Sequence, residues 1–333
     1  MPEALALLAL AVAIFARAPL PFTGITKSKE FLSPWRFVPL SKSPHWARGM
    51  DTIKSHRRLP HVSCALRSVV LWLLTLGSLT ANEGVESTYR LPARDSAFLD
   101  DLQRRAVRYF VEQTDPATGL TLDRSSVDGG IGDSPSSVAA TGFALTAWCI
   151  ADARGWVHPG DALKRVRHTL RFLVQHHAHE HGFFYHFVDG STGKRAWNSE
   201  ASTIDTALLL QGALFAREYL RDREVTALVE WIYARIDWQW AMNDGRTLSH
   251  GWMPEIGFIE HRWERYAELL GLYLLGIGAP RKPLPAEAWN AWSREPRVSF
   301  GERTFIQCGP LFTHQYAHGW FDFRGRRDTH ADY

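Results

Sequence analysis

The chain has 333 residues, of which 45% are hydrophobic, and its 38 Lys and Arg against 35 Asp and Glu give a formal net charge of +3. No long basic run lies outside the N-terminal region, which argues against nucleic acid as a partner. The length and apolar fraction suffice for one large globular domain or two ordinary ones.

Two N-terminal segments have the composition of processing signals rather than of a folded domain. An apolar run over residues 4–16 follows Glu3 and is too short to span a bilayer. A second pattern begins at Met50, with basic residues at 54–58, an apolar stretch at 69–76 and a small-residue cleavage site before Asn82. We therefore predict a spurious or disordered extension over 1–49, a signal peptide over 50–81, and a periplasmic or secreted mature chain without a stable membrane span.

From Asp95 onward the hydrophobic periodicity predicts helices. Apolar residues recur every three or four positions in seven segments: 99–109, 136–154, 161–174, 203–220, 225–236, 263–277 and 286–292. Short links, 154–160 and 221–222, alternate with the long links 114–136, 178–202 and 237–262. This alternation places every long link at the same end of the helices. It indicates an all-α toroid of helical hairpins with a site at one mouth, where Asp123, Glu200 and Glu255 would meet.

Tryptophan is abundant, with 14 residues in an aromatic fraction of 12%. Indole faces stack on the apolar faces of pyranose rings, so this excess favours a carbohydrate groove. Large aromatic residues that fill a helical core are an equally good explanation.

The stretch from Trp197 to Tyr219 combines a polar loop with an apolar helix. Ser202 and Asp205 have the spacing of a capping box, so the helix is predicted to begin at Thr203. Glu200 then lies just before a helix N-terminus. It is a candidate catalytic acid presented on a rigid element, or a loop glutamate favoured by the helix dipole.

The histidines at 177, 179 and 181 flank Glu180 and could suggest a metal site. They fall at a predicted helix end, where histidine is favourable for other reasons. We therefore predict no metal and no cofactor.

Seven sequence blocks in a fixed order resemble the glycoamylase-like family, which includes the endo-β-1,2-glucanases of glycoside hydrolase family 144. The resemblance covers about Phe98 to Tyr333 and defines a predicted domain over 95–333. The blocks are GLTLDRS (119–125), SVAATGFALTA (137–147), GFFYHFVD (182–189), SEASTIDTALLLQGALFAREY (199–219), HGWMPEIGF (250–258), WERYAELLGLYLLGIG (263–278) and PLFTHQYAHGWFDFR (310–324).

This resemblance implies an (α/α)6 barrel that hydrolyses β-1,2-glucan with inversion. Inversion needs a protonated acid and a base that acts through water, with carboxyl groups roughly 6.5–9.5 Å apart. Glu200 matches the glutamate of the family's central motif and is the predicted general acid. Partial desolvation beside Trp197 is expected to raise its pKa.

The general base is less defined by the resemblance. Asp123 is the first candidate, although Arg124 beside it also suggests a plain ion pair. Asp128 and Asp133 are alternatives in the same glycine-rich loop, and Glu268 is a further catalytic candidate. The predicted substrate-binding residues are Arg124, His186, Trp197, Asp205, Trp252, Trp263 and Tyr266, although the capping box alone accounts for Asp205.

The expected partner is a β-glucan oligosaccharide or polysaccharide, and the chain is expected to be a monomer. Three departures from the family pattern bear on activity. The segment 278–282, Gly-Ala-Pro-Arg-Lys, stands where a small polar turn is expected. Tyr266-Ala267-Glu268 stands where relatives have a Tyr-Asn-Glu triplet, and relatives continue past the position of Tyr333. The barrel is therefore expected to be incomplete at its C-terminus. The alternative functions are a non-catalytic glucan-binding module and an inactive truncated fragment.

Overall fold

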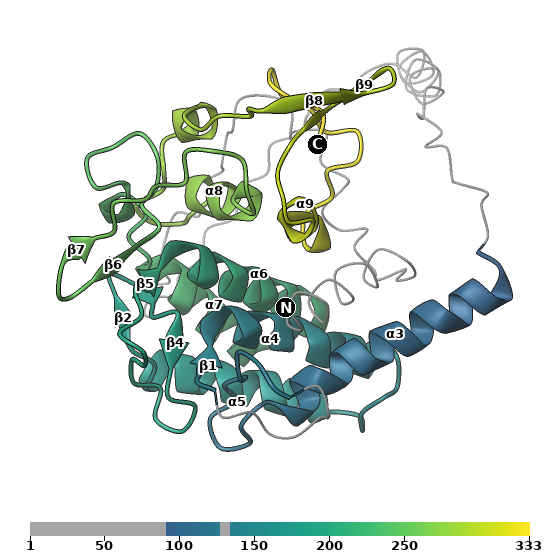
Figure 1. The fold of residues 1–333 in the computed structure, drawn as a ribbon. Coiled ribbons are helices and arrows are strands. Elements are labelled where there is room, and N and C mark those ends of the chain that lie inside the picture. The colour runs from purple at the N-terminus through teal and green to yellow at the C-terminus, as the bar shows by residue number, and fades with distance from the viewer. Residues whose placement is uncertain (1–90, 127–133) are drawn as a thin grey trace, which may run out of the picture. The chain divides into compact units, whose positions relative to one another are not determined.

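The computed structural model describes residues 91–126 and 134–333, and residues 93–333 belong to one compact unit (Figure 1). The predicted extension over 1–49 and the predicted signal peptide over 50–81 lie outside the described residues, as do Asp128 and Asp133. In the described part of the chain, no helix combines the length and apolarity needed to cross a bilayer.

Helices make up most of the regular secondary structure of the described chain, as predicted. Its α-helices are α3 (Ala93–Glu112), α4 (Val138–Ala153), α5 (Asp161–Gln175), α6 (Thr203–Leu220), α7 (Arg223–Arg235), α8 (Leu270–Ile277) and the short α9 (Phe312–Gln315). Helices α4 and α6 are apolar and buried on nearly all sides, whereas α3, α5 and α7 bury one face only. The buried pair therefore forms an inner layer and the amphipathic helices an outer one.

Two glycines allow α4 and α6 to approach closely. A Cβ atom added at Gly212 would lie 1.9 Å from the backbone oxygen of Gly142, and one added at Gly142 would lie 2.4 Å from the Cα of Leu209. The distance between packed helices depends on the side chains at their contact, so removing both side chains brings the backbones together. This contact fixes the position of α6, whose N-terminus carries the candidate site.

The start of α6 matches the predicted capping box. Ser202 is the N-cap residue, and its hydroxyl accepts a hydrogen bond from the backbone N–H of Asp205. The Asp205 carboxylate accepts a 2.5 Å hydrogen bond from the same hydroxyl. The side chain of Asp205 is thereby held inside the first turn of the helix.

Short strands tie the long loops together at one end of the helices (Figure 1). Strand β1 (Ser136–Ser137) pairs with β4 (Phe187–Val188), and β5 (Ala201–Ser202) pairs with β6 (Gly251–Met253), which continues to β7 (Gly257–Phe258). These pairings join the three long links, so their predicted meeting is confirmed.

Two neighbouring strands of the long link 178–202 pair with different partners. Strand β3 (Phe183–Phe184) pairs with β2 (His179–Glu180), whereas β4 pairs with β1. The two neighbouring strands satisfy their backbone groups with different loops. His186 lies between them, at the point where the loops meet.

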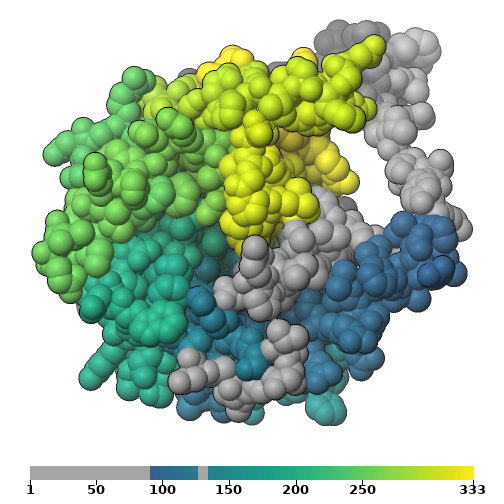
Figure 2. Space-filling view, viewed as in Figure 1, coloured from purple at the N-terminus to yellow at the C-terminus, as the bar shows by residue number. Residues whose placement is uncertain are grey.

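The chain after residue 260 is less helical than predicted. Helix α8 begins at Leu270 instead of Trp263, because the backbone carbonyls of Trp263 and Glu264 accept hydrogen bonds from the Tyr273 hydroxyl and the Ser293 N–H. Those acceptors are not free for a helical turn. The remaining elements are the 3-10 turns η3 (Trp240–Met242), η4 (Ala286–Asn290) and η5 (Ala317–Gly319) and the surface hairpin of β8 (Arg297–Phe300) and β9 (Arg303–Ile306) (Figure 2).

The C-terminal segment returns to the inner helices. The indole of Trp320 packs against Phe143 of α4 with ring centroids 4.8 Å apart, and its Nε1 donates to the Thr146 hydroxyl at 3.1 Å. This contact joins the end of the chain to the first half of the helical layer.

Candidate active site

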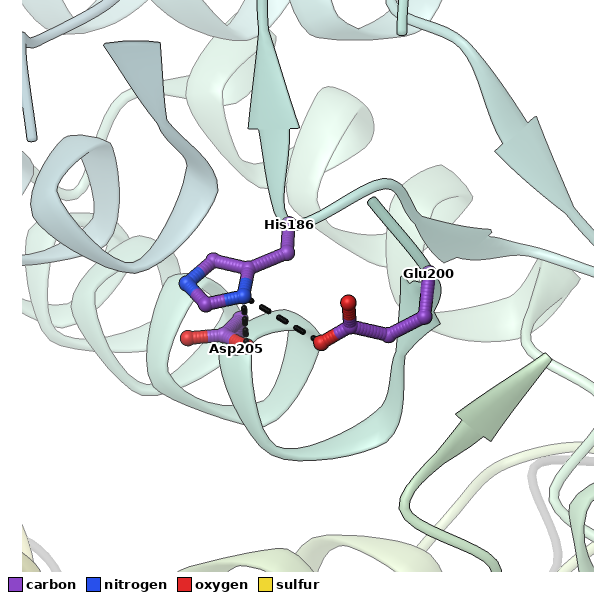
Figure 3. Close-up of side chains that lie close together, drawn as sticks. All are labelled: His186, Glu200 and Asp205. Atoms are coloured by element: carbon purple, nitrogen blue, oxygen red, sulfur yellow. Dashed lines mark hydrogen bonds and ion pairs between the residues drawn. The ribbon is translucent and has the colours of Figure 1, made fainter. Parts of the chain in front are cut away.

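His186, Glu200 and Asp205 form a cluster at the N-terminus of α6 (Figure 3). The Nδ1 atom of His186 lies 3.2 Å from Oε1 of Glu200 and 3.6 Å from Oδ2 of Asp205. The side chains of His186 and Glu200 are each about one-quarter exposed, at 26%, and that of Asp205 is 11% exposed. Two carboxylates therefore converge on one imidazole at the edge of the protein interior.

The backbone places these groups. The N–H of His186 donates to the carbonyl of Glu200 at 2.9 Å, so the two residues are neighbours across adjoining loops. On the other side of Glu200, a Cβ atom added at Gly251 of β6 would lie 2.7 Å from the Glu200 Cγ. Only a glycine in this conformation leaves room for the glutamate side chain there.

The ionisation of His186 and Glu200 follows from their contact. Burial works to lower the pKa of His186, but Asp205 and Glu200 outweigh it and raise the pKa to about 9. Burial works to raise the pKa of Glu200, but the hydrogen bond and charge of His186 leave it below the ordinary value. The predicted rise in the Glu200 pKa is therefore wrong for the free site, because the sequence did not reveal the neighbouring imidazolium.

Two other carboxyl groups have pKa values above their ordinary range. Burial raises the pKa of Asp205, partly opposed by the charge of His186 and the hydrogen bond from Ser202. Burial also raises the pKa of Glu268, and the charge of Asp205 adds to it. Glu268 lies in the turn before α8 instead of on a helix, and it interacts electrostatically with Asp205.

Asp123 and Arg124 pair at the rim of this group. Their side chains form an ion pair with a 2.6 Å contact, as the simpler interpretation predicted. Asp123 also acts electrostatically on His186 and Asp205, so it belongs to the cluster as well as to the ion pair. The Arg124 guanidinium lies 5.9 Å from the centre of the Trp197 ring.

Trp197 is the most exposed tryptophan of the loops, at 60% of its surface. Trp197 and Asn198 both have positive φ angles, of 53° and 50°, a conformation that is uncommon outside glycine. This uncommon turn directs the indole outward, three residues before Glu200. Trp197 therefore offers an open aromatic surface beside the carboxylates.

The other predicted aromatic ligands are more enclosed. Trp263 and Tyr266 are buried, and Trp263 donates from Nε1 to the Thr203 hydroxyl at 3.0 Å. Trp252 on β6 is partly buried and packs 6.2 Å from Trp240. These contacts support the loop framework, and a substrate-binding role for the three residues stays a prediction.

Sequence reasoning missed His250 and Arg195. His250 stacks on Trp263 with ring centroids 4.0 Å apart and interacts electrostatically with Glu200. Arg195 donates to both carboxylate oxygens of Glu255, at 2.5 and 2.9 Å, which neutralises that glutamate at the rim. The block HGWMPEIGF contains His250, so its position within the resemblance was the available signal.

The cluster also has a donor set that could hold a metal ion. The ligand atoms of His186, Glu200 and Asp205 lie within 4.8 Å of one another. Among the described residues, this is the one group of His, Cys, Asp or Glu side chains close enough to share a metal ion. The separation of 3.2 Å between Nδ1 and Oε1 is that of a hydrogen bond, and a proton on Nδ1 satisfies both carboxylates. The histidines at 177, 179 and 181 are not brought together as ligands.

The fold is of the glucanase and glucoamylase-like helical class. The structure resembles that of an endo-β-1,2-glucanase from Chitinophaga pinensis, determined with sophorotriose and glucose, with a TM-score of 0.63 and 23% identity over 73% of this chain and 64% of that one. It also resembles a β-1,2-glucanase from Parabacteroides distasonis, with a TM-score of 0.54 and 26% identity over 62% of this chain and 30% of that one.

Sequence comparison agrees with this class. The glycoamylase family model, described as "Putative glucoamylase", matches residues 260–333. An exo β-1,2-glucooligosaccharide sophorohydrolase (non-reducing end) from Parabacteroides distasonis is 24% identical over 242 residues, which are 67% of this chain. The chain spans about a third of that relative's length, 32%. The resemblance to the glycoamylase-like family is thus confirmed, and its relatives include β-1,2-glucanases.

Proposed function

We propose that this chain is a glycoside hydrolase that acts on β-glucan, with β-1,2-glucan as the substrate, by inverting acid/base hydrolysis. The relatives named above act on β-1,2-linked glucan or its oligosaccharides. The observation that carries the proposal is the cluster of carboxyl groups whose environments move their pKa values in opposite directions. An (α/α)6 barrel is the architecture that we propose for the fold.

Acid/base hydrolysis needs one protonated and one ionised carboxyl at the same pH. The low pKa of Glu200 supports an ionised group, and the raised pKa of Glu268 supports a protonated one. Environments that separate the pKa values of neighbouring carboxyls are how such roles are divided. Asp123 is a further carboxylate at the rim, within electrostatic range of the cluster.

Glucan binding is assigned to the open side of the cluster. The exposed indole of Trp197 can stack on a glucose ring, and Arg124 beside it can donate hydrogen bonds to hydroxyl groups. A glucan that lies on this surface would pass next to Glu200. The mature chain is proposed to act as a monomer in the periplasm or outside the cell, where the predicted signal peptide would direct it.

The test is sugar release from linear β-1,2-glucan by the full chain, followed by NMR of the first products. We expect reducing ends that appear first as the α-anomer, since inversion at a β-linkage gives α. A first product in the β-anomer would contradict inversion. A folded chain that binds the glucan without releasing sugar would replace the hydrolase with a glucan-binding module, which the exposed Trp197 would still explain.

A further inference from the structure

We propose that His186 is a positioning residue of this site: its protonated Nδ1 joins Glu200 to Asp205 and so fixes the orientation and charge state of Glu200. This inference rests on the proposed function and deepens it, because it concerns how the same carboxylate is controlled. The sequence suggested only that His186 binds substrate.

The geometry gives His186 a single proton to share. A neutral imidazole carries one N–H, and a protonated ring carries one on each nitrogen. Nδ1 faces both carboxylates, at 3.2 Å from Glu200 Oε1 and 3.6 Å from Asp205 Oδ2 (Figure 3). The lone pair of an unprotonated Nδ1 would repel the two carboxylate oxygens. The arrangement therefore requires a proton on Nδ1.

Asp205 is the most firmly held member of the cluster of His186, Glu200 and Asp205. It is buried in the first turn of α6, where the Ser202 hydroxyl donates to Oδ2 at 2.5 Å. A carboxylate this enclosed cannot reorient when substrate binds. The imidazole is held against it, with its ring also stacked on Phe187 at 3.7 Å between centroids.

Several charged groups around His186 determine together how its proton is held. Glu200, Asp205 and Asp123 act on the imidazole directly and favour its charged form. Beyond them, Glu268 interacts electrostatically with Asp205. His250 and Arg195 interact electrostatically with Glu200. Since these groups interact, their protons leave in steps that belong to the whole unit.

Removing the imidazolium should therefore change the titration of Glu200 more than it changes substrate binding. Without the positive charge at 3.2 Å, the effect of burial on Glu200 would be opposed only by a backbone hydrogen bond and the charge of His250, so its carboxyl would hold a proton at higher pH. In His186→Asn we expect the acidic limb of the pH profile of kcat/KM to move upward by about one pH unit, with KM changed less than about twofold.

The direct experiment is an NMR titration of the histidine side chains in the full chain, with His186→Asn used to assign the resonance. We expect His186 to titrate near pH 9 and its midpoint to fall by at least about one unit in Glu200→Gln and in Asp205→Asn. Glu255→Gln, which removes an exposed carboxylate paired with Arg195, is the matched control and should leave the midpoint in place.

The inference would be overturned if His186 titrated near the ordinary value of 6.5 and Glu200→Gln did not change that midpoint. A His186→Asn variant that lowers only the melting temperature and leaves the pH profile unchanged would overturn it as well. The titration needs no substrate. A chain without hydrolytic activity would refute the proposed function while the coupling of His186 to Glu200 is still measured.

Discussion

Glu200 is the residue on which the chemistry of the site depends. The sequence located it correctly at the start of a helix, because the capping pattern of Ser202 and Asp205 is local. Its ionisation was mispredicted, because His186 lies 14 positions earlier and is brought to it by a backbone hydrogen bond between two loops. Spacing along the chain carries no information on such a contact.

Replacing Glu200 by Gln should slow hydrolysis of β-1,2-glucan by about 10²–10⁴-fold, since either acid or base catalysis is lost. The low pKa of Glu200 favours the base role over the acid role that the sequence predicted. We therefore expect that a glucoside with a good leaving group, which needs no acid, does not restore turnover in this variant. Recovery with such a substrate would return the acid role to Glu200.

Trp197 should contribute to binding rather than to stability, because 60% of its surface is exposed. Trp197→Ala should weaken glucan binding by about 1–3 kcal/mol, as for other aromatic anchors, with little change in the melting temperature. Calorimetric titration with β-1,2-gluco-oligosaccharide measures the first effect. Trp231→Ala is the control, since Trp231 is 49% exposed on α7 and stacks on Arg235 away from the cluster.

At the scale of secondary-structure elements, the strongly periodic helices were predictable and the loops were not. Helix α6 has the predicted bounds, because a cap and an all-apolar face mark both its start and its course. The segment from Trp263 is also rich in apolar residues, yet the carbonyls of its first turn accept hydrogen bonds from Tyr273 and Ser293 instead of from the next helical turn. Partners distant in sequence decide where such a helix begins, and a single sequence does not show them.

The contact between α4 and α6 gives a sharp test of the inner layer. A Cβ atom at Gly212 would meet the Gly142 carbonyl at 1.9 Å, which neither backbone can relieve without moving a helix. Gly212→Ala should therefore destabilise the fold by at least about 1–3 kcal/mol, despite the better helix propensity of alanine. Urea denaturation measures the loss.

Gly271→Ala in α8 is the matched comparison. Its added Cβ would meet the amide end of Gln211, at 2.6 Å, which a side-chain rotation can relieve. It should cost clearly less than Gly212→Ala. Equal losses would show that helix propensity or burial in general, and not the α4–α6 contact, sets the effect.

At the scale of the whole molecule, two histidines with opposite environments should each contribute to the pH dependence of stability, alongside other histidines such as His179. His177 is buried and largely neutral, since burial lowers its pKa from 6.5 to about 4. His186 is held charged, with a pKa raised from 6.5 to about 9 by Asp205 and Glu200 against the effect of burial. Each pKa differs from its unfolded value, so each makes the free energy of unfolding depend on pH.

The signs are opposite. The unfolded chain binds a proton at His177 more readily than the folded chain, so its contribution is present above pH 6.5 and is lost as the pH falls toward 4. The folded chain binds the proton at His186 more readily, so that contribution is complete below pH 6.5 and is lost as the pH rises through about 9.

We expect the free energy of unfolding, measured in urea between about pH 4 and pH 9, to fall toward both ends of the range. His177→Phe should reduce the loss on the acid side, and His186→Asn should reduce the loss on the alkaline side, whatever their effects on absolute stability. A His186→Asn variant that keeps the full alkaline loss would mean that other groups cause it.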